Sequence, residues 1–425
     1  MSSNIYNELK WRGMIHDQID GVEKLIREKS VTLYNGFDPT ADSLHVGHMV
    51  PLIALARFQR YGHHVLALAG GGTCMIGDPS GRSAERNLLS REEVLYNVEC
   101  IKNQLAHFLD FEVKANPAKI VNNMDWLDQL SMLDFLRDTG KYFTINYMLS
   151  KDSVKNRMDR ESGLSFTEFS YMLLQSYDFL HLHKEMGCEL QCGGSDQWGN
   201  ITAGTDLIRK VTGDSVYGLT YPLIKKSDGT KFGKTASGAV WLDSKRTSPY
   251  KFYQFWLNTD DNDVIHYLKF FTFFDEKTIT GLEAETREHP EARAAQKALA
   301  VEMTRMMHGE TAVDNAQQAS QALFGGDIIG LSAEDIHDIF SEVPSFDIPA
   351  DNFSGDGINV VDVLTGIGFL KSKGEARRGI QEGGVYVNNN RVTNVAMNIT
   401  LSNFIDGKYL VLRRGKKNYF LVKAI

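Results

Sequence analysis

Two histidines are the first residues in this sequence with the type and spacing for chemistry. His45 and His48 lie in the segment PTADSLHVGH, residues 39–48, which joins a short apolar run to a helical pattern that continues through MVPLIALARF. Residues three apart share one helix face, and the first turn of a helix carries partial positive charge. Two imidazoles there can bind phosphate oxygens, and Gly47 leaves the backbone open to a flat base or ribose. Both can equally be ordinary residues at the start of a packed helix.

A second segment suits the same chemistry. Lys231, Lys234 and Thr235 lie in SDGTKFGKT, a polar glycine-rich stretch that predicts a mobile loop. A single loop lysine is usually a solvated surface residue. Beside a phosphate-binding helix, however, two lysines can close over a pyrophosphate as negative charge develops on it. The glycines between residues 70 and 77 match neither a P-loop nor a dinucleotide fingerprint, because the required lysine and third glycine are missing.

Three polar residues interrupt the apolar helical run FTEFSYMLLQSYDFLHL, residues 166–182. Tyr171, Gln175 and Asp178 are spaced by four and three, so they share one face of one helix. Polar groups in such a place need partners, because a buried polar group without a hydrogen bond is costly. The spacing alone leaves two interpretations open: an internal hydrogen-bond network or a ligand site.

Composition excludes several classes of protein. The 425 residues are 42% hydrophobic and 24% charged, as in globular proteins, and neither a membrane span nor an apolar leader is visible. We therefore expect no membrane partner and a cytoplasmic location. The four cysteines are too few for a disulfide scaffold. Cys188 and Cys192 follow two histidines, but without a close Cys-x2-Cys pair we prefer buried thiols to a zinc site and expect no tightly bound metal.

The elements that must position these residues alternate between strand and helix from Val31 to Tyr221. This alternation predicts an α/β fold with a doubly wound parallel sheet, whose ligands bind at the carboxyl ends of the strands. We expect a catalytic domain at 1–245, a helical domain at 246–343 and a linker rich in proline, glycine and small polar residues at 344–357. A small α+β domain at 358–425 follows.

Charge is divided unevenly along the chain. From Gly355 to the end there are six lysines and five arginines against five acidic residues, or +6, which leaves −14 for the rest of a chain whose total is −8. A compact basic module on an acidic protein favours a polyanionic partner, although solvated surface charge explains part of it.

The two phosphate-binding segments carry a family resemblance. PTADSLHVGH is similar to the His-x-Gly-His element of class I aminoacyl-tRNA synthetases, and KFGKT, residues 231–235, resembles their lysine-bearing loop. GGSDQWGN, residues 193–200, and the C-terminal module fit the tyrosine-specific bacterial type from end to end. The resemblance implies activation of tyrosine by ATP with Mg²⁺, release of pyrophosphate, and transfer of tyrosine to the 3′ end of tRNA(Tyr).

The resemblance also implies roles for individual residues. Those that stabilise phosphate charge are Thr40, His45, His48, Lys231, Lys234 and Thr235. Those that bind tyrosine are Tyr34, Asp78, Tyr171, Gln175, Asp178, Thr73 and Asn123. Those that bind ATP are Gly36, Asp38, Gly47, Gly194, Asp196, Gln197 and Lys234. In this scheme Tyr34 and Asp178 bond the substrate's phenolic hydroxyl, and Tyr171, Gln175 and Asp78 hold its ammonium group.

The C-terminal segment resembles a small RNA-binding domain shared by a ribosomal protein and several RNA-modifying enzymes. Its expected phosphate contacts are Lys371, Lys373, Arg377, Arg378, Arg413, Arg414, Lys416 and Lys417. A homodimer is implied by the family, with residues 126–143 as the expected interface, including Leu133, Phe135 and Leu136. The same residues can also be ordinary core.

Three alternatives stay open. A small nucleotidyltransferase would explain the histidine motif but not the tail. The related tryptophan enzyme would share the fold, although Tyr34 paired with Asp178 suits a hydroxyl better than an indole. A protein that has lost catalysis would retain only the RNA-binding function of the C-terminal domain. Tyrosine-dependent ATP–pyrophosphate exchange, compared with tryptophan and phenylalanine, separates the three.

Overall fold

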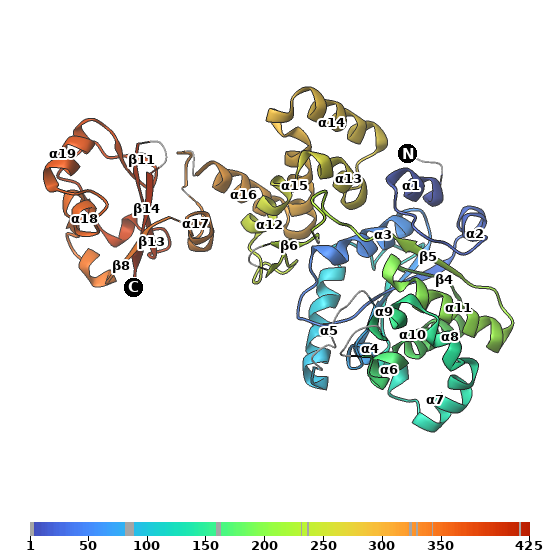
Figure 1. The fold of residues 1–425 in the computed structure, drawn as a ribbon. Helices are drawn as coiled ribbons and strands as arrows, with labels where there is room; N and C mark the ends of the chain where they lie inside the picture. The colour runs from blue at the N-terminus through green and yellow to red at the C-terminus, as the bar shows by residue number, and fades with distance from the viewer. Residues whose placement is uncertain are drawn as a thin grey trace. The chain divides into compact units, whose positions relative to one another are not determined.

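The chain forms two compact units in which distant segments combine. The first contains Met1–Asp243 and Thr259–Leu299, and the second contains Ser244–Asn258 and Ala300–Ile425 (Figure 1). The computed structural model describes residues 4–80, 89–158, 163–230, 232–235, 238–322, 325–328, 330–341, 343–415 and 418–425. No helix in this described part of the chain combines the length and apolar character needed to cross a membrane.

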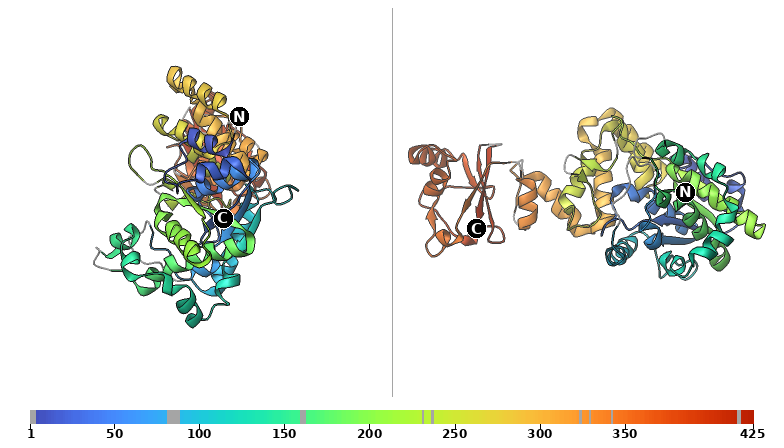
Figure 2. Two further views of the ribbon diagram at one scale, coloured as in Figure 1. Left: turned by 90° about the vertical axis from the view of Figure 1, so that its right-hand side faces the viewer. Right: turned by 60° about the horizontal axis from the view of Figure 1, so that its bottom comes forward.

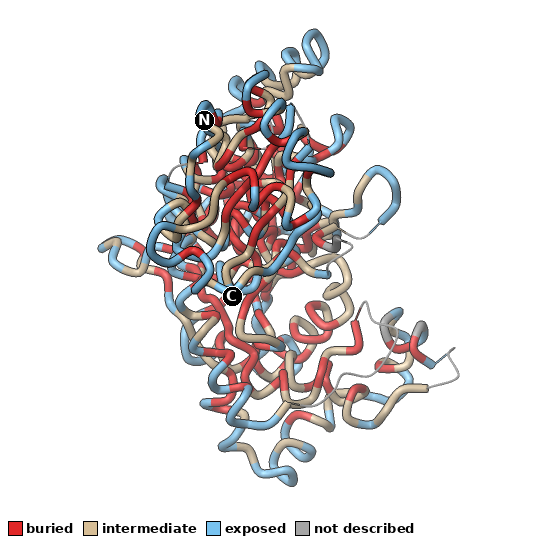
Figure 3. Tube along the Cα trace, turned by 90° about the vertical axis from the view of Figure 1, so that its left-hand side faces the viewer, coloured by how far each residue is buried: buried red, intermediate tan, exposed pale blue. Residues whose placement is uncertain are grey.

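The first unit is built on a five-stranded parallel sheet in the order β3-β2-β1-β4-β5. Its strands are β1 (Thr32–Phe37), β2 (His64–Ala69), β3 (Lys119–Asn122), β4 (Cys188–Gly194) and β5 (Tyr217–Tyr221). Central strands covered by helices on both faces are apolar throughout, and five of the six residues of β2 are buried. Buried residues are drawn in red in Figure 3. The predicted doubly wound parallel sheet is confirmed.

Strand order locates the place where a ligand is expected. From β1 the chain continues outward to β2 and β3, and it returns to the other side of β1 with β4 and then β5. Tyr34 therefore pairs with Leu66 on one side and with Gln191 on the other. In open parallel sheets, ligands bind beyond the carboxyl ends of the strands where the order reverses. Here that point lies beyond Phe37 and Gly194.

Helices and short turns connect these strands and complete the first unit. They are α1 (Ile5–Arg12), α2 (Val22–Glu28), η1 (Val46–His48), α3 (Met49–Arg60), α4 (Gly71–Cys74), α5 (Arg91–Leu105), α6 (Met124–Leu127), α7 (Met132–Asp138), η2 (Gly140–Tyr142), α8 (Ile145–Leu149), α9 (Asp152–Met158), α10 (Phe166–Met186), η3 (Ser195–Gln197), α11 (Trp198–Thr212), α13 (Asp261–Phe271), α14 (Glu276–Glu288) and η4 (Pro290–Ala292). A short hairpin pairs β6 (Lys234–Thr235) with β7 (Gly238–Ala239). The longest helix, α10, starts at the N-cap Ser165 and ends at Gly187, whose φ of 62° suits glycine.

The second unit combines helices with a mixed sheet. The helices are α12 (Pro249–Leu257), α16 (Glu310–Ala322), α17 (Ala333–Ile339), α18 (Val360–Gly366) and α19 (Lys373–Gln381), with turns η5 (Ala350–Phe353) and η6 (Leu401–Asn403); α15 (Ala294–His308) spans the boundary between the units. The sheet, in the order β11-β10-β13-β14-β8, contains β8 (Ser345–Ile348), β10 (Val385–Val387), β11 (Asn390–Arg391), β13 (Tyr409–Arg414) and β14 (Asn418–Ala424). A separate pair joins β9 (Ile358–Asn359) to β12 (Asn398–Ile399).

Alternation along β13 shows why this sheet has a core on each face. Leu410 and Leu412 belong to a core with α18 and α19, whereas Val411 belongs to a different core with Ile336 and Ile339 of α17. Side chains of successive strand residues point to opposite faces, so an apolar run buries both. The strands and the helices beside them are the red and orange elements of Figure 2.

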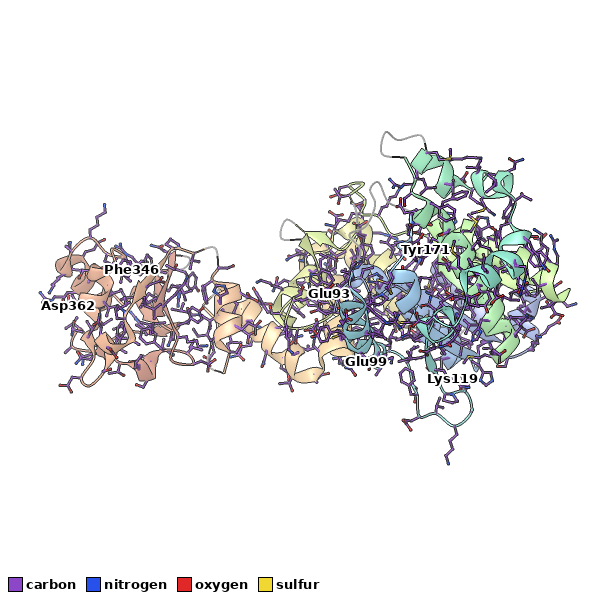
Figure 4. The ribbon with its side chains drawn as sticks, turned by 90° about the horizontal axis from the view of Figure 1, so that it is seen from below. Glu93, Glu99, Lys119, Tyr171, Phe346 and Asp362 are labelled. Carbon is purple, nitrogen blue, oxygen red and sulfur yellow. The ribbon has the colours of Figure 1, made fainter. Side chains whose placement is uncertain are left out.

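The predicted linker at 344–357 is wrong. Residues 345–348 form β8, which pairs in parallel with β14 from Leu421 to Ala424, and Phe353 is buried in the C-terminal core. Phe346 of this strand is labelled in Figure 4. Proline near each end of the strand made the segment look irregular, but proline is tolerated beside an edge strand. The expected helical domain at 246–343 is also divided, because Thr259–Leu299 belongs to the first unit.

Candidate active site

The histidine motif forms a compact turn at the start of α3. His45 Nδ1 accepts from Gly47 N at 3.0 Å, and His48 Nδ1 accepts from His45 N at 3.2 Å. The two rings stack with centroids 3.9 Å apart. Because each Nδ1 accepts a hydrogen bond, the neutral ring carries its proton on Nε2. Both imidazoles are thus held as Nε2–H donors, as a phosphate site requires.

Close packing constrains Gly47 of the motif, whereas two other predicted residues, Gly36 and Thr40, lie on the surface. A Cβ at Gly47 would lie 2.7 Å from His45 Cε1, so a side chain at this position would displace the His45 ring. Gly36 has no such constraint, because its nearest contact, Leu68 Cδ2, would be at an ordinary 3.8 Å. Gly36 and Thr40 are both exposed, near the carboxyl end of β1.

The segment that follows the lysine loop (residues 225–235) bonds the histidine motif through the main chain. Val46 N donates to Val240 O at 3.0 Å, and Leu242 N donates to Leu44 O at 2.8 Å. A Cβ at Gly233 would lie 2.8 Å from Val46 Cγ2, which places the loop backbone directly against the motif. The two segments that resemble the synthetase motifs therefore lie together. The backbone of Lys234 and Thr235 forms β6, and Lys231 lies outside the described residues.

A buried carboxylate marks the other half of the site. Asp178 on α10 is 1% exposed, and its two oxygens accept from Trp126 Nε1 and Asn123 Nδ2, each at 2.8 Å. Burial raises the pKa of Asp178 to about 7, although the bonds from Asn123 and Trp126 favour the ionised form. Each oxygen retains capacity for another donor. The carboxylate is thus fixed in place and still able to accept a hydrogen bond.

A chain of side-chain hydrogen bonds connects Asp178 to the end of β1. Asn123 Nδ2 also donates to Thr73 Oγ1 at 3.0 Å, and Thr73 Oγ1 donates to Asp38 Oδ1 at 3.0 Å. Tyr171, labelled in Figure 4, donates to Asp38 Oδ2 at 3.0 Å. Burial raises the pKa of Tyr171 well above its usual value, with the charge of Asp38 acting in the same direction. Four residues predicted from sequence therefore form one network around Asp178.

Tyr34 is the exception within this network. Its hydroxyl is buried, yet it has no hydrogen-bond partner among the described residues. Burial raises the pKa of Tyr34 well above its usual value, and the charge of Asp178 raises it further. The ring lies against Phe179 of α10, with centroids 5.5 Å apart. A buried hydroxyl without a partner is costly, so a polar ligand would satisfy a group that the protein leaves open.

A third group of polar residues lies beyond β4. Gln197 Nε2 donates to Asp78 Oδ2 at 2.7 Å, and Asn200 Nδ2 donates to Gln175 Oε1 at 3.0 Å and to Gln197 Oε1 at 3.1 Å. Burial raises the pKa of Asp196, with the charge of Asp78 acting in the same direction. These contacts bring together predicted residues from η3, from α10 and from the loop after α4.

Close packing constrains one further predicted residue. A Cβ at Gly194 would lie 2.6 Å from Asp196 Oδ1. A side chain at the end of β4 would therefore displace that carboxylate.

Sequence reasoning missed Trp126 and Asn200 as site residues. Trp126 was assigned only to a candidate interface, yet its indole N–H bonds Asp178 and its ring stacks on His181 with centroids 4.3 Å apart. Asn200 lies one turn after Gln197, and its amide joins Gln175 to Gln197. For Asn200 the available signal was its place in GGSDQWGN, but nothing in the sequence showed which distant residues Asn200 and Trp126 would meet.

The suspected zinc ligands have other partners. Cys188 and Cys192 are buried free thiols in β4, and His183 bonds Cys188 O at 2.9 Å and Asp214 Oδ2 at 3.1 Å. In the described ranges, no group of three or more His, Cys, Asp or Glu side chains is arranged to hold a metal ion.

The predicted RNA-binding cations divide into exposed and internally bonded groups. Arg377 and Arg378 are exposed on α19. Lys373 pairs with Asp362 at 2.6 Å, and Arg414 pairs with Glu375 at 2.7 Å. Lys371 is exposed just before the helix, while Lys416 and Lys417 lie outside the described residues.

The phosphate-binding role expected for Arg413 is not supported. Its side chain is 8% exposed, donates to Asn389 Oδ1 and Gly415 O, and lies 3.6 Å from the centroid of the Tyr386 ring. A guanidinium packed over an aromatic ring and bonded on both sides stabilises the sheet. Alternation along β13 turned this residue inward, which its sequence cluster did not reveal.

Exposed apolar side chains occur in the expected interface region, residues 126–143, and in the segments that follow it. Leu133 on α7 is 79% exposed and Phe166 at the start of α10 is 74% exposed. Met132, Leu136 and Ile145 are also exposed.

Known proteins resemble the chain along its whole length. Residues 27–325 match the family described as tRNA synthetases class I (W and Y), and residues 335–422 match the tyrosine–tRNA ligase SYY-like C-terminal domain. The chain is 56% identical over 423 residues to the tyrosine–tRNA ligase of Roseiflexus castenholzii, covering 100% of both chains. It is 53% identical over 419 residues to that of Geobacillus stearothermophilus, covering 98% of both.

Solved structures give the same result. A C-terminally truncated mitochondrial tyrosyl-tRNA synthetase of Aspergillus nidulans superposes with a TM-score of 0.69 at 34% identity, over 76% of this chain and 94% of that one.

Proposed function

The chain belongs to the class I tRNA synthetases of the tryptophan and tyrosine group, and from this premise we infer that it is a tyrosine–tRNA ligase. It activates tyrosine with ATP to give tyrosyl-adenylate and pyrophosphate, and it then transfers tyrosine to the 3′ end of its tRNA. Relatives that match over the full length and carry this name support the assignment. Mg²⁺ enters with ATP as part of the substrate.

The observation that favours tyrosine over tryptophan is that the buried carboxylate of Asp178 lies near the buried hydroxyl of Tyr34. A phenol has one donor and one acceptor, so it can donate to the buried carboxylate and accept from the Tyr34 hydroxyl, which has no partner among the described residues. An indole has a donor only and would leave Tyr34 unsatisfied. Phenylalanine would leave the Tyr34 hydroxyl unpaired and would give Asp178 no further donor, and such buried groups are the basis of strong discrimination.

In the first step, a carboxylate oxygen of tyrosine attacks the α-phosphorus of ATP. A new P–O bond forms as the bond to the bridging oxygen breaks, and pyrophosphate leaves with its electron pair. Tyr171, Gln175 and Asp78 would hold the ammonium group, so that the carboxylate faces the nucleotide. The Nε2–H groups of His45 and His48 would donate to phosphate oxygens. Such fixed donors cost no rearrangement when charge develops, so positioning and electrostatics supply the rate.

The same assignment gives roles to the remaining residues near the nucleotide. Asp38, Gly36 and Gly47 would contact ATP from β1 and the histidine turn, and Asp196 and Gly194 would contact the ribose from β4. Gln197 would lie near the reacting carboxylate, while Thr40, Lys231, Lys234 and Thr235 would contact the phosphates. In the second step, a hydroxyl of the terminal adenosine of tRNA attacks the carbonyl carbon, and AMP leaves.

The test is ATP–pyrophosphate exchange with each of three amino acids. We expect exchange with tyrosine and little with tryptophan or phenylalanine. Exchange driven by tryptophan would reject the pocket assignment, and exchange with none of the three would favour a chain that binds RNA without catalysis.

We also propose that the C-terminal domain binds the tRNA and that the enzyme acts in the cytoplasm, where translation uses charged tRNA. The family match of residues 335–422 and the exposed Arg377 and Arg378 support the first statement. Weaker tRNA binding with retained exchange after neutralising these arginines is the expected result.

A homodimer is the third part of the proposal. The exposed apolar side chains of α7 and the start of α10, including Leu133 and Phe166, would pack against a second copy. Sedimentation of the native chain and of Leu133→Asp tests this. We expect a dimer for the former and a monomer for the latter, and an unchanged dimer would place the interface elsewhere.

A further inference from the structure

The first turn of α13 contains a carboxylate bonded to the lysine loop. The N-cap of this helix is Asp260, whose side chain accepts from the backbone of Asn262. An acidic residue at the third helical position commonly bonds back to the N-cap N–H. Asp263 occupies that position, but it accepts from Ser227 instead, from the N–H at 3.0 and 3.2 Å and from the hydroxyl at 3.3 Å.

Ser227 lies in a tight turn at the beginning of the loop. Lys226 N donates to Thr230 O at 3.1 Å, and Gly229 N donates to Lys226 O at 2.9 Å. The carboxylate that holds this turn is largely buried, with Asp263 9% exposed. A charged acceptor with little access to water makes a stronger hydrogen bond than a solvated one. The turn is therefore attached firmly to α13.

A second contact attaches the loop further along. The Phe232 ring stacks on Phe271 with centroids 5.2 Å apart and planes inclined by 18°, and it meets Tyr267 edge-on at 5.1 Å. Asp263, Tyr267 and Phe271 follow one another at spacings of four, so they share one face of α13. We call these three residues the loop seat. The seat holds the loop just before β6, which contains Lys234.

The far end of α13 is bonded to the helix that follows the histidine motif. Arg57 of α3 donates to Phe270 O at 2.9 Å and to Thr272 O at 2.5 Å, and Arg12 donates to Phe274 O at 2.6 Å. Cations at a helix C-terminus are favourable because the last carbonyls carry partial negative charge. Through α13, the lysine loop and the histidine motif therefore share one rigid frame.

We propose that Asp263 is a positioning residue for adenylate formation: it fixes the lysine loop relative to the histidine motif and touches no substrate. The proposal rests on the proposed function, because the loop matters only if it acts on ATP. A carboxylate with only a structural role would stabilise α13, and its loss would not lower the rate of adenylate formation more than the affinity for tyrosine. A positioning role predicts a lower rate of adenylate formation with an unchanged Kd of tyrosine.

The experiment compares Asp263→Ala, Asp263→Asn and Asp261→Asn in the full-length protein. Asp261 lies in the same helical turn but is exposed and accepts from Gln296, so its substitution is the matched control. Stopped-flow gives the rate of adenylate formation at saturating ATP, equilibrium dialysis gives the Kd of tyrosine without ATP, and thermal unfolding gives the midpoint. Because a detached loop is no longer held in position for the reaction, we expect about a tenfold lower rate for Asp263→Ala.

We expect that rate to fall while the Kd of tyrosine and the unfolding midpoint stay close to wild type, with Asp263→Asn intermediate and Asp261→Asn unaffected. An unchanged rate in Asp263→Ala would overturn the proposal, as would a parallel loss of rate and tyrosine affinity. If Asp263→Ala does not fold, the same readings on Asp263→Asn decide. Absence of tyrosine-dependent exchange in the wild type would instead reject the proposed function.

Discussion

The two halves of the candidate active site are held together in different ways. Around Asp178, buried side chains bond one another, with Asn123 fully buried and bonds of 2.8 to 3.0 Å running through Thr73. Around His45, the bonds come from the main chain, as in Val46 N to Val240 O, and Gly47 between the histidines is exposed. One half is a closed polar network, and the other is an open turn beside a loop.

This difference follows from what each half recognises. An amino acid is selected by neutral and singly charged groups of fixed shape, and buried partners discriminate best because an unpaired group there is costly. A triphosphate is large and strongly charged, and its charge moves during reaction, so donors near the surface suffice to hold it. Substitutions in the two halves should therefore affect different steps.

The largest effect is expected in the open half, for Lys234→Ala. Loss of one donor to a developing phosphate charge should slow adenylate formation by about 10²-fold and leave the Kd of tyrosine nearly unchanged. Stopped-flow and dialysis measure the two quantities, with the exposed Lys225→Ala in the same loop as the control. A parallel loss of tyrosine affinity would mean that the halves are not separable.

In the closed half, Asp178→Ala should act on recognition. The phenol would lose a charged partner, which predicts a fall of about 10- to 100-fold in kcat/KM for tyrosine. The value for phenylalanine should change less, so the ratio between the two substrates narrows. Asn123 and Trp126 also lose their acceptor, and Asp178→Asn serves as the isosteric control. A ratio that stays at its wild-type value would show that the phenol is recognised elsewhere.

Titration of Asp178 gives a smaller, graded change. Burial raises the pKa of this carboxyl to about 7 from a usual 3.8, so the free enzyme holds it protonated below neutrality. We expect kcat/KM for tyrosine to fall by up to about tenfold per pH unit below 7 and to level off above it. The kcat/KM for phenylalanine should show no such decrease below pH 7. A tyrosine profile that is flat from pH 5.5 to 8 would contradict this.

The same titration has a consequence for stability. A carboxyl whose pKa is raised by folding contributes stability that is complete below the unfolded value of 3.8 and is lost as pH rises through about 7. Asp178→Asn removes this dependence. The unfolding free energy of Asp178→Asn minus that of the wild type should therefore increase as pH rises across that window, so that the variant becomes the relatively more stable protein.

The smallest effect is expected outside both halves, for Arg377→Ala combined with Arg378→Ala. These exposed arginines should contribute to tRNA affinity only, and their removal should lower the log–log salt slope by roughly 0.7 to 0.9 for each phosphate that is no longer neutralised. Pyrophosphate exchange should not change. Salt titrations of tRNA binding measure the slope, with the exposed Lys408→Ala as the control. An unchanged slope would place the tRNA on other residues.

Point substitutions are preferable here to removal of residues 351–425. Ile336, Ile339 and Phe340 pack in one core with Val411 and Leu421 of the C-terminal sheet. Deletion would uncover these apolar side chains, so loss of activity would not distinguish RNA binding from misfolding.

Much of the fold was predictable because it depends on local pattern. Alternating strands and helices predict a parallel sheet, and the first unit is built on one. Spacings of three and four placed Tyr171, Gln175 and Asp178 on one helix face, because the helical repeat fixes that geometry regardless of the rest of the chain. Uneven charge likewise pointed to a basic C-terminal module.

What the sequence by itself determined is therefore what neighbours along the chain decide: strand, helix, helix face and regional charge. Only the tertiary structure decided that β8 joins the C-terminal sheet, that Arg413 faces inward, and that Asp263 bonds Ser227. Each of these depends on contacts between residues far apart in sequence, and no local propensity specifies which distant partner a buried polar or apolar group will meet once the chain has packed.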